Sequence, residues 1–306
     1  MTPETSPRFV FVLGSGRCGS SLVHEVLAQH EDVGFLSNIE DRLPVPAALG
    51  RWNGPIYRRL PLALTEKGRM RFAPSEGYRV LAREVSPIIA RPTRDLLASD
   101  ASPWMGSRFG RFFRDHASAQ GRGVFLHKFT GWPRARFIDA VLRETRFIHV
   151  IRDGRAVANS LLQMPWWRGF EGPTAWGWGP LAEEDAAAWE AAGRSFPVLA
   201  ALEWKMLMDA FADAKASIGP ERWIDVRYED LLRDPTATTK ELLGFIGLSW
   251  TSGFEDRFRR YPFDASRAEL FRRDLDPSDV SAMEVVLGSH LRDLGYPLSS
   301  KGESPR

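Results

Sequence analysis

A glycine-rich turn near the N-terminus is the feature that most limits what this chain can form. Residues 8–13 read RFVFVL, a short run of β-branched and aromatic side chains, and the glycine-rich turn follows at residues 14–21. An amphipathic pattern over residues 20–30 then predicts a helix. Strand, glycine-rich turn and helix in this order are typical of a phosphate-binding unit, because backbone amides and the positive end of the helix face one point.

Four further short apolar runs alternate with helical patterns along the chain. The predicted strands cover residues 33–36, 124–127, 146–151 and 223–227, and the predicted helices cover about 135–144, 155–163, 183–218 and 236–246. Alternating strands and helices predict an α/β fold with a P-loop-like parallel central sheet that is flanked by helices on both faces.

Two segments do not follow this alternation. Residues 41–123 are rich in Pro, Arg and Gly and contain helical pieces such as 107–116, so we expect a helical insertion over the active site at the carboxyl edge of the sheet. Residues 163–180 form an irregular loop that holds four tryptophans. With 306 residues and 43% hydrophobic side chains, we expect one domain over residues 1–306 that includes both segments.

Charge and cysteine content exclude several classes of partner. A net charge of +2 is too small to favour nucleic acid or an anionic membrane as the main partner. The single cysteine, Cys18, excludes an internal disulfide and suits a reducing compartment. Residues 1–8 lack the apolar stretch of a signal peptide, and no apolar run reaches the length of a membrane span. We therefore expect a cytoplasmic protein, whose oligomeric state the sequence leaves open.

The glycine-rich turn departs from the pattern of nucleotide triphosphatases. Ser20 occupies the position at which a P-loop carries its lysine, and no acidic partner for Mg²⁺ is evident at a later strand end. The cation within the turn is Arg17. A donor with fewer phosphates, cleaved without a metal, fits this turn better than ATP does, and we expect no metal site. A glycine-rich turn that only packs a helix onto the sheet is the structural alternative.

A second group of candidate ligands follows the predicted strand 146–151. Arg152 stands at the carboxyl end of this strand, and Ser160 lies in the helix that follows. In an open α/β sheet both would sit near the crevice in which ligands bind. A guanidinium and a hydroxyl are suitable donors for a second phosphate.

These segments resemble the sulfotransferase family. The 14–21 turn is similar to the family's 5′-phosphosulfate loop, and the segment IRDGRAVANS, which starts at Ile151, resembles its 3′-phosphate motif. The segment VRYEDLL followed by Asp234-Pro235, and the segment FRRDL from Phe271, resemble later motifs of bacterial members. The resemblance runs in order over about residues 8–36 and 124–298 and leaves only the insertion unmatched.

The resemblance implies a donor, 3′-phosphoadenosine 5′-phosphosulfate, and a role for each matching residue. It implies that Arg152 and Ser160 hold the 3′-phosphate, that Tyr228 lies against the adenine, and that Arg272 or Arg273 closes over the 3′ side. The 5′-phosphosulfate would be held by Gly16, Arg17, Cys18, Gly19, Ser20 and Ser21. Tyr228 as a core side chain, and Arg272 and Arg273 as a solvated surface pair, are the structural alternatives.

Two catalytic roles follow from the proposed chemistry. In-line sulfuryl transfer leaves negative charge on the departing bisphosphate, and Arg17 is the candidate that stabilises this charge. Arginine at this position is frequent in the branch that sulfates carbohydrates and protein tyrosines, which suggests that side of the family. For the base that deprotonates the acceptor we favour Glu40, followed by His127 and Asp41, and a mechanism without a base stays open.

The acceptor is not identified by the sequence. The resemblance implies a hydroxyl or an amine on a small molecule, a carbohydrate or a peptide, and the tryptophans of residues 163–180 offer flat faces for stacking or simply pack their loop. The alternatives to a sulfotransferase are a P-loop kinase that uses ATP and a nucleotide-binding relative without transfer activity.

Overall fold

The centre of the molecule is one parallel sheet. The computed structural model describes residues 7–61 and 73–299, and in this part of the chain five strands pair in the order β2-β3-β1-β4-β5. The strands are β1 (Arg8–Gly14), β2 (Val33–Phe35), β3 (Val124–Thr130), β4 (Arg146–Ile151) and β5 (Trp223–Arg227). All four pairings are parallel, so the five carboxyl ends meet at one edge of the sheet.

Alternate side chains of each strand enter two separate cores. In β1, Val10 and Val12 belong to one apolar cluster while Phe11 and Leu13 belong to the other, and all four are fully buried. Because successive side chains point to opposite faces, this division shows that both faces of the sheet are covered.

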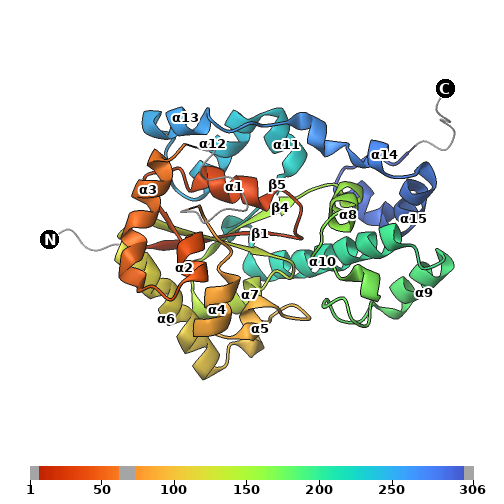
Figure 1. Ribbon diagram of the computed structural model, residues 1–306, viewed down its shortest axis with the longest axis horizontal. Coiled ribbons are helices and arrows are strands. Elements are labelled where there is room, and N and C mark those ends of the chain that lie inside the picture. Colours follow the sequence, from red (N-terminus) through yellow and green to blue (C-terminus); the bar gives the residue numbers. More distant parts are fainter. Residues whose placement is uncertain (1–6, 62–72, 300–306) are drawn as a thin grey trace.

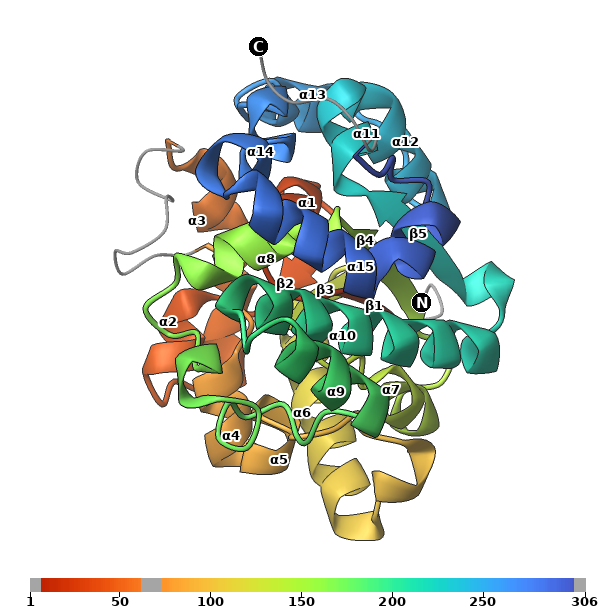
Figure 2. The same ribbon diagram turned by 90° about the vertical axis from the view of Figure 1, so that its right-hand side faces the viewer.

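Helices cover both faces of the sheet (Figure 1). One face carries α1 (Ser20–Leu27), α11 (Tyr228–Arg233), α12 (Pro235–Phe245) and α13 (Ser252–Phe258). The other face carries α4 (Tyr78–Glu84), α5 (Pro87–Ala90), α6 (Pro103–Gln120), α7 (Ala135–Val141), α8 (Gly154–Leu162), α10 (Phe196–Ile218), α14 (Phe271–Asp274) and α15 (Pro277–Asp293). Figure 2 shows α10 running across this second face, with α15 beside it and α9 (Glu183–Ala191) outside.

The predicted fold class is confirmed, with two corrections to the elements. The helix predicted over residues 183–218 is two helices, because Gly193 and Arg194 adopt positive φ and Ser195 caps the start of α10. The strand predicted to end at His127 continues to Thr130 as β3. This extension places Lys128 and Thr130 at the carboxyl edge of the sheet.

The segment predicted as an insertion is helical where the structure describes it. Besides α4, α5 and α6 it contains the end of α2 (Asn38–Arg42), α3 (Asn53–Arg59) and the 3₁₀ turns η1 (Ala47–Trp52) and η3 (Ala98–Asp100). Residues 62–72 of this segment, and the terminal residues 1–6 and 300–306, lie outside the described part. The extents of the single domain and of the insertion stay predictions.

A buried arginine fixes the helix that carries Ser160. Arg155 is fully buried in the first turn of α8, where it pairs with Asp153 at 2.6 Å and with Glu284 of α15. It also donates to the carbonyl of Pro297 at 2.9 Å. Arg155 therefore attaches α8 to the C-terminal segment, whereas Arg152, three residues earlier, points to the loop after β1.

None of the helices in the described ranges is both long enough and apolar enough to cross a membrane.

Candidate functional site

The loop between β1 and α1 has an unusual backbone. Gly16, Arg17 and Gly19 have φ values of 82°, 53° and 94°, in the left-handed region that non-glycine residues seldom adopt. A Cβ added at Gly16 would have no neighbour within 4 Å, so this part of the loop borders open space. A tight turn of this kind at the start of a helix presents backbone amides to an anion.

Tyr228 packs directly on this loop. A Cβ at Gly19 would lie only 2.2 Å from the Tyr228 ring, so a glycine is needed for the contact as well as for the positive φ. The guanidinium of Arg152 lies over the Tyr228 ring, 4.9 Å from its centroid. Tyr228 begins α11 and is 7% exposed.

Arg152 and Ser160 reach the same loop from β4 and α8. Arg152 donates from Nη1 to the carbonyl oxygen of Arg17 at 3.0 Å, and Arg17 donates from Nε to Ser160 Oγ at 2.9 Å. The Nε of Arg152 is buried and has no hydrogen-bond partner among the described residues. The four residues Arg17, Arg152, Ser160 and Tyr228, predicted from three separate motifs, therefore lie together.

The two guanidinium groups repel one another. Burial, and next the positive charge of Arg152, lower the pKa of Arg17 from its usual value. The hydrogen bonds of both side chains go to carbonyl and hydroxyl oxygens. Two cations held together in this way favour the binding of an anion between them.

The remaining predicted ligands of the loop differ in position. Cys18 is fully buried against Gly14, and Ser20 is 3% exposed. Ser21 accepts a hydrogen bond from Lys128 Nζ at 2.6 Å. Cys18 therefore packs beneath the loop, and its backbone is the part left to face a ligand.

Arg272 and Arg273 lie on the surface of α14. Both are exposed, and they pair with Glu269 and Asp274. A C-terminal residue that contacts Arg152 directly is Arg267 in η6 (Ala265–Ala268), whose backbone carbonyl accepts from Arg152 Nη2 at 2.6 Å. Arg267 lies outside the FRRDL motif, so no sequence signal marks it.

The two predicted carboxylate bases are held by hydrogen bonds, Glu40 in the interior and Asp41 at a partly exposed position. Glu40 is 3% exposed and accepts hydrogen bonds from Ser37 and Asn53, and with Ser37 it forms a capping box at the start of α2. Asp41 accepts from the backbone amides of Arg79 and Val80. In both cases the carboxylate holds local structure.

His127 lies in the aromatic core beneath the sheet edge. Its ring is fully buried, and the centroids of the Phe113 and Phe129 rings lie 5.1 Å and 4.7 Å away. Burial, and next the charge of Lys128, lower the pKa of His127 to about 3.

A polar cluster at the end of β3 was not found from the sequence. Lys128 Nζ pairs with Glu76 Oε1 at 2.7 Å, and Thr130 Oγ1 donates to the same oxygen at 3.4 Å. The hydroxyl of Tyr78 in turn bonds to the carbonyl and hydroxyl of Thr130, both at 3.1 Å. The sequence signal was the polar pair Lys128 and Thr130 at a strand end, but its partner lies more than 50 residues earlier.

The tryptophans of residues 163–180 divide into two groups. Trp167 and Trp176 are buried, whereas Trp166 is 55% exposed. Trp178 packs on the backbone of Gly131, where an added Cβ would lie 2.7 Å from its ring. Part of the loop is therefore held in the core, and the Trp178 ring packs on the residue that follows β3.

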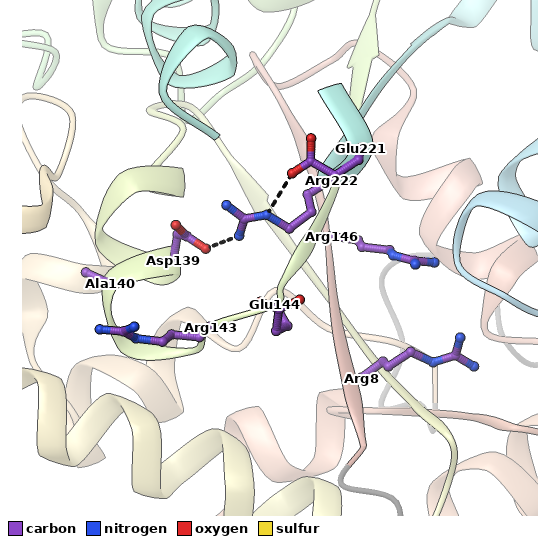
Figure 3. Close-up of a pocket in the computed structure, with 8 residues that line it drawn as sticks. All are labelled: Arg8, Asp139, Ala140, Arg143, Glu144, Arg146, Glu221 and Arg222. Carbon is purple, nitrogen blue, oxygen red and sulfur yellow. Dashed lines mark hydrogen bonds and ion pairs between the residues drawn. The ribbon is translucent and has the colours of Figure 1, made fainter. Parts of the chain in front are cut away.

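A cavity of about 740 Å³ lies at the opposite edge of the sheet. Figure 3 shows that it is lined by Arg8, Asp139, Ala140, Arg143, Glu144, Arg146, Glu221 and Arg222. Arg8 and Arg146 begin β1 and β4, so this cavity is remote from the loop, and Arg222 pairs there with Asp139 and Glu221. Among the described residues, no group of three or more His, Cys, Asp or Glu side chains is placed to hold a metal ion.

Comparison with known proteins gives a family match. The model of the sulfotransferase family matches residues 7–252, which is most of the chain. No curated protein matches the sequence.

Several solved structures share the fold. The sulfotransferase domain from the curacin biosynthetic pathway is 14% identical, with a TM-score of 0.56 over 96% of this chain and 99% of that one. The sulfotransferase STF9 from Mycobacterium avium is 16% identical, with a TM-score of 0.58 over 96% of this chain and 78% of that one. STF1 from Mycobacterium tuberculosis H37Rv is 16% identical, with a TM-score of 0.50 over 88% and 76%. At such low sequence identity, these structures support the fold alone.

Proposed function

The chain belongs to the sulfotransferase family, and from this premise we propose that it transfers a sulfuryl group from 3′-phosphoadenosine 5′-phosphosulfate to a hydroxyl or an amine. The proposal includes the residues that bind the donor, the cation that stabilises the leaving group, the class of acceptor and a cytoplasmic location. The last rests on one buried, unpaired cysteine.

The observation that carries the proposal is the meeting of three segments at one point. Arg17 of the loop contacts Ser160 of α8, and Arg152 after β4 contacts both the loop and the Tyr228 ring. A donor with phosphates at both its 5′ and 3′ positions needs two anion sites with an adenine site beside them. The loop, the pair Arg152 and Ser160, and the Tyr228 face supply these three parts.

The unpartnered Nε of Arg152 fits this assignment. A buried N–H without a partner costs free energy, which a phosphate oxygen would recover. We assign the 3′-phosphate to Arg152 and Ser160, and the 5′-phosphosulfate to the amides of residues 16–20 with the side chains of Arg17, Ser20 and Ser21. Because the backbone carbonyl of Arg267 accepts from Arg152, we expect η6 to lie beside the 3′ side, and Arg272 or Arg273 of α14 stays the proposed cation that closes over it.

The chemical role assigned to Arg17 is electrostatic. When the sulfuryl group leaves, its bond to the 5′-phosphate breaks and the electron pair stays on the phosphate oxygen. A guanidinium keeps its proton, so Arg17 stabilises the new charge without donating a proton. An arginine at this position supports an acceptor of the carbohydrate or peptide type. Trp178, which packs beside the carboxyl end of β3, and the exposed Trp166 offer ring faces for such an acceptor.

A thermal-shift experiment tests the donor. Adenosine 3′,5′-bisphosphate is expected to raise the Tm of the protein, while ATP with Mg²⁺ at the same concentration raises it much less, because only a ligand that binds the native state stabilises it. A larger shift with ATP and Mg²⁺ would favour a P-loop kinase. Stabilisation by the bisphosphate without cleavage of the donor, whichever acceptor is added, would favour a binding protein without transfer activity.

A further inference from the structure

The cluster at the end of β3 joins a carboxylate to the phosphate loop. Lys128 Nζ lies 2.7 Å from Glu76 Oε1 and 2.6 Å from Ser21 Oγ, so one ammonium bridges the two groups. The Glu76 carboxylate is therefore within two hydrogen-bond lengths of a side chain assigned to the 5′-phosphosulfate.

The backbone explains why this connection is short. Thr130 pairs with Gly14 in the register of β3 and β1, and the amide of Gly131 donates to the Gly14 carbonyl at 2.9 Å. The carboxyl end of β3 thus lies against the first residue of the loop. Glu76 reaches this point from the segment before α4, and the hydroxyl of Tyr78, the first residue of α4, contacts Thr130.

Glu76 differs from the buried candidates in its access to solvent. Its side chain is 30% exposed, whereas Lys128 beneath it is 6% exposed. Glu40 and His127 are 3% and 0% exposed, and their surroundings are a helix cap and an aromatic core. A base must touch the acceptor. Of Glu40, His127 and Glu76, only Glu76 has a partly exposed side chain, and Lys128 connects it to Ser21 of the loop.

We propose that Glu76 is the general base that deprotonates the acceptor. The inference rests on the proposed function. In the step, the acceptor oxygen or nitrogen forms a bond to sulfur while its proton passes to a carboxylate oxygen of Glu76. The bond between sulfur and the bridging oxygen breaks, and its electron pair leaves with the bisphosphate next to Arg17.

The neighbours of Glu76 have positioning roles. Lys128 favours the ionised, proton-accepting form of the carboxylate. Although burial alone would lower the pKa of Lys128, the charge and hydrogen bond of Glu76 raise it above the usual value, so the ammonium stays charged. The Thr130 hydroxyl, itself held by Tyr78, donates to the same carboxylate oxygen and limits its rotation. Trp178 on Gly131 places an aromatic ring beside this end of the strand.

The test compares Glu76→Gln with wild type in cleavage of 3′-phosphoadenosine 5′-phosphosulfate. Water, aliphatic alcohols and 4-nitrophenol are offered as acceptors. Glutamine keeps the size and the hydrogen bond of the side chain but accepts no proton. We expect the rate with water and alcohols to fall about 10²-fold, and the rate with 4-nitrophenol, which ionises without help, to fall less than about tenfold. The acid limb of the pH–rate profile should disappear, and the Kd of the bisphosphate should change less than about threefold.

Further variants separate a base from a structural partner of Lys128. Glu76→Asp keeps the charge and should retain the pH limb at a reduced rate, and Glu241→Gln on the exposed face of α12 is the matched control. Equal losses for all acceptors, an unchanged pH profile in Glu76→Gln, or loss of the limb in Glu40→Gln instead would overturn the inference. Each of these results leaves the proposed function standing as long as wild type binds the bisphosphate and cleaves the donor. A wild type that does neither refutes the proposed function itself.

Discussion

Replacement of Arg17 by alanine is expected to lower kcat by about 10²–10³-fold while the Kd of adenosine 3′,5′-bisphosphate rises less than about tenfold. The loop amides, Arg152 and Ser160 would remain to bind the nucleotide, whereas the charge that appears on the leaving oxygen would lose its nearest cation. The Arg17 backbone already adopts a left-handed φ of 53°, and its Nε is held by Ser160, so the guanidinium is fixed before the reaction. A preorganised donor contributes most where charge develops.

Single-turnover cleavage of the donor, together with calorimetry of the bisphosphate, separates the two effects. Arg17→Lys keeps a charge and should lose less activity than Arg17→Ala. Arg259→Ala, at an exposed arginine directly after α13, is the matched control and should behave like wild type. If Arg17→Ala weakens binding as much as it slows turnover, the role in the transition state is wrong.

The second large expected effect is a loss of folding stability at alkaline pH. Glu203 lies fully buried on α10, and its Oε2 accepts from the indole of Trp167 at 2.9 Å. Burial, partly opposed by the indole hydrogen bonds, raises the pKa of Glu203 from 4.5 to about 8. The folded protein therefore holds a proton that the unfolded chain releases above pH 4.5. Stability is highest below that pH, falls as pH rises toward about 8, and changes no further above it.

Linkage gives a loss of about 3–5 kcal/mol over this range. Glu203→Gln keeps an acceptor for Trp167 but cannot ionise, so its unfolding free energy at pH 9 should exceed that of wild type by about this amount and the two should agree near pH 4. Denaturant titrations at both pH values, with Glu241→Gln as an exposed control, measure the difference. Parallel pH profiles of wild type and Glu203→Gln would show that Glu203 is not the titrating group.

The arrangement of the fold was accessible to sequence analysis because it depends on local patterns. The strands β4 (RFIHVI) and β5 (WIDVR) are short segments rich in β-branched and aromatic residues, and their predicted bounds agree with the structure. The break between α9 and α10 was missed, since the helical periodicity continues through residues that only the positive φ of Gly193 and Arg194 interrupts. The end of β3 was predicted too early because Lys128 and Thr130 are polar. Lys128 is nevertheless buried, and its ammonium pairs with Glu76.

The candidate site shows the same division. The loop and the segment around Arg152 are contiguous motifs, so the sequence could name their residues. Glu76 and Arg267 reach the site through tertiary contacts that no spacing encodes. For Glu40 a local signal existed: Ser37 followed three residues later by a glutamate is the spacing of a capping box, and the structure forms one.

The measurement that tests the central claim most directly is calorimetric titration of wild type and Arg152→Ala with adenosine 3′,5′-bisphosphate and with adenosine 5′-phosphate. If Arg152 holds the 3′-phosphate, wild type prefers the bisphosphate, and Arg152→Ala weakens its binding by about 2 kcal/mol, roughly 30-fold. Adenosine 5′-phosphate should bind both proteins alike, because it lacks the group that Arg152 contacts. Equal binding of the two nucleotides by wild type, or equal losses of both in Arg152→Ala, would contradict the 3′-phosphate site and with it the proposed donor.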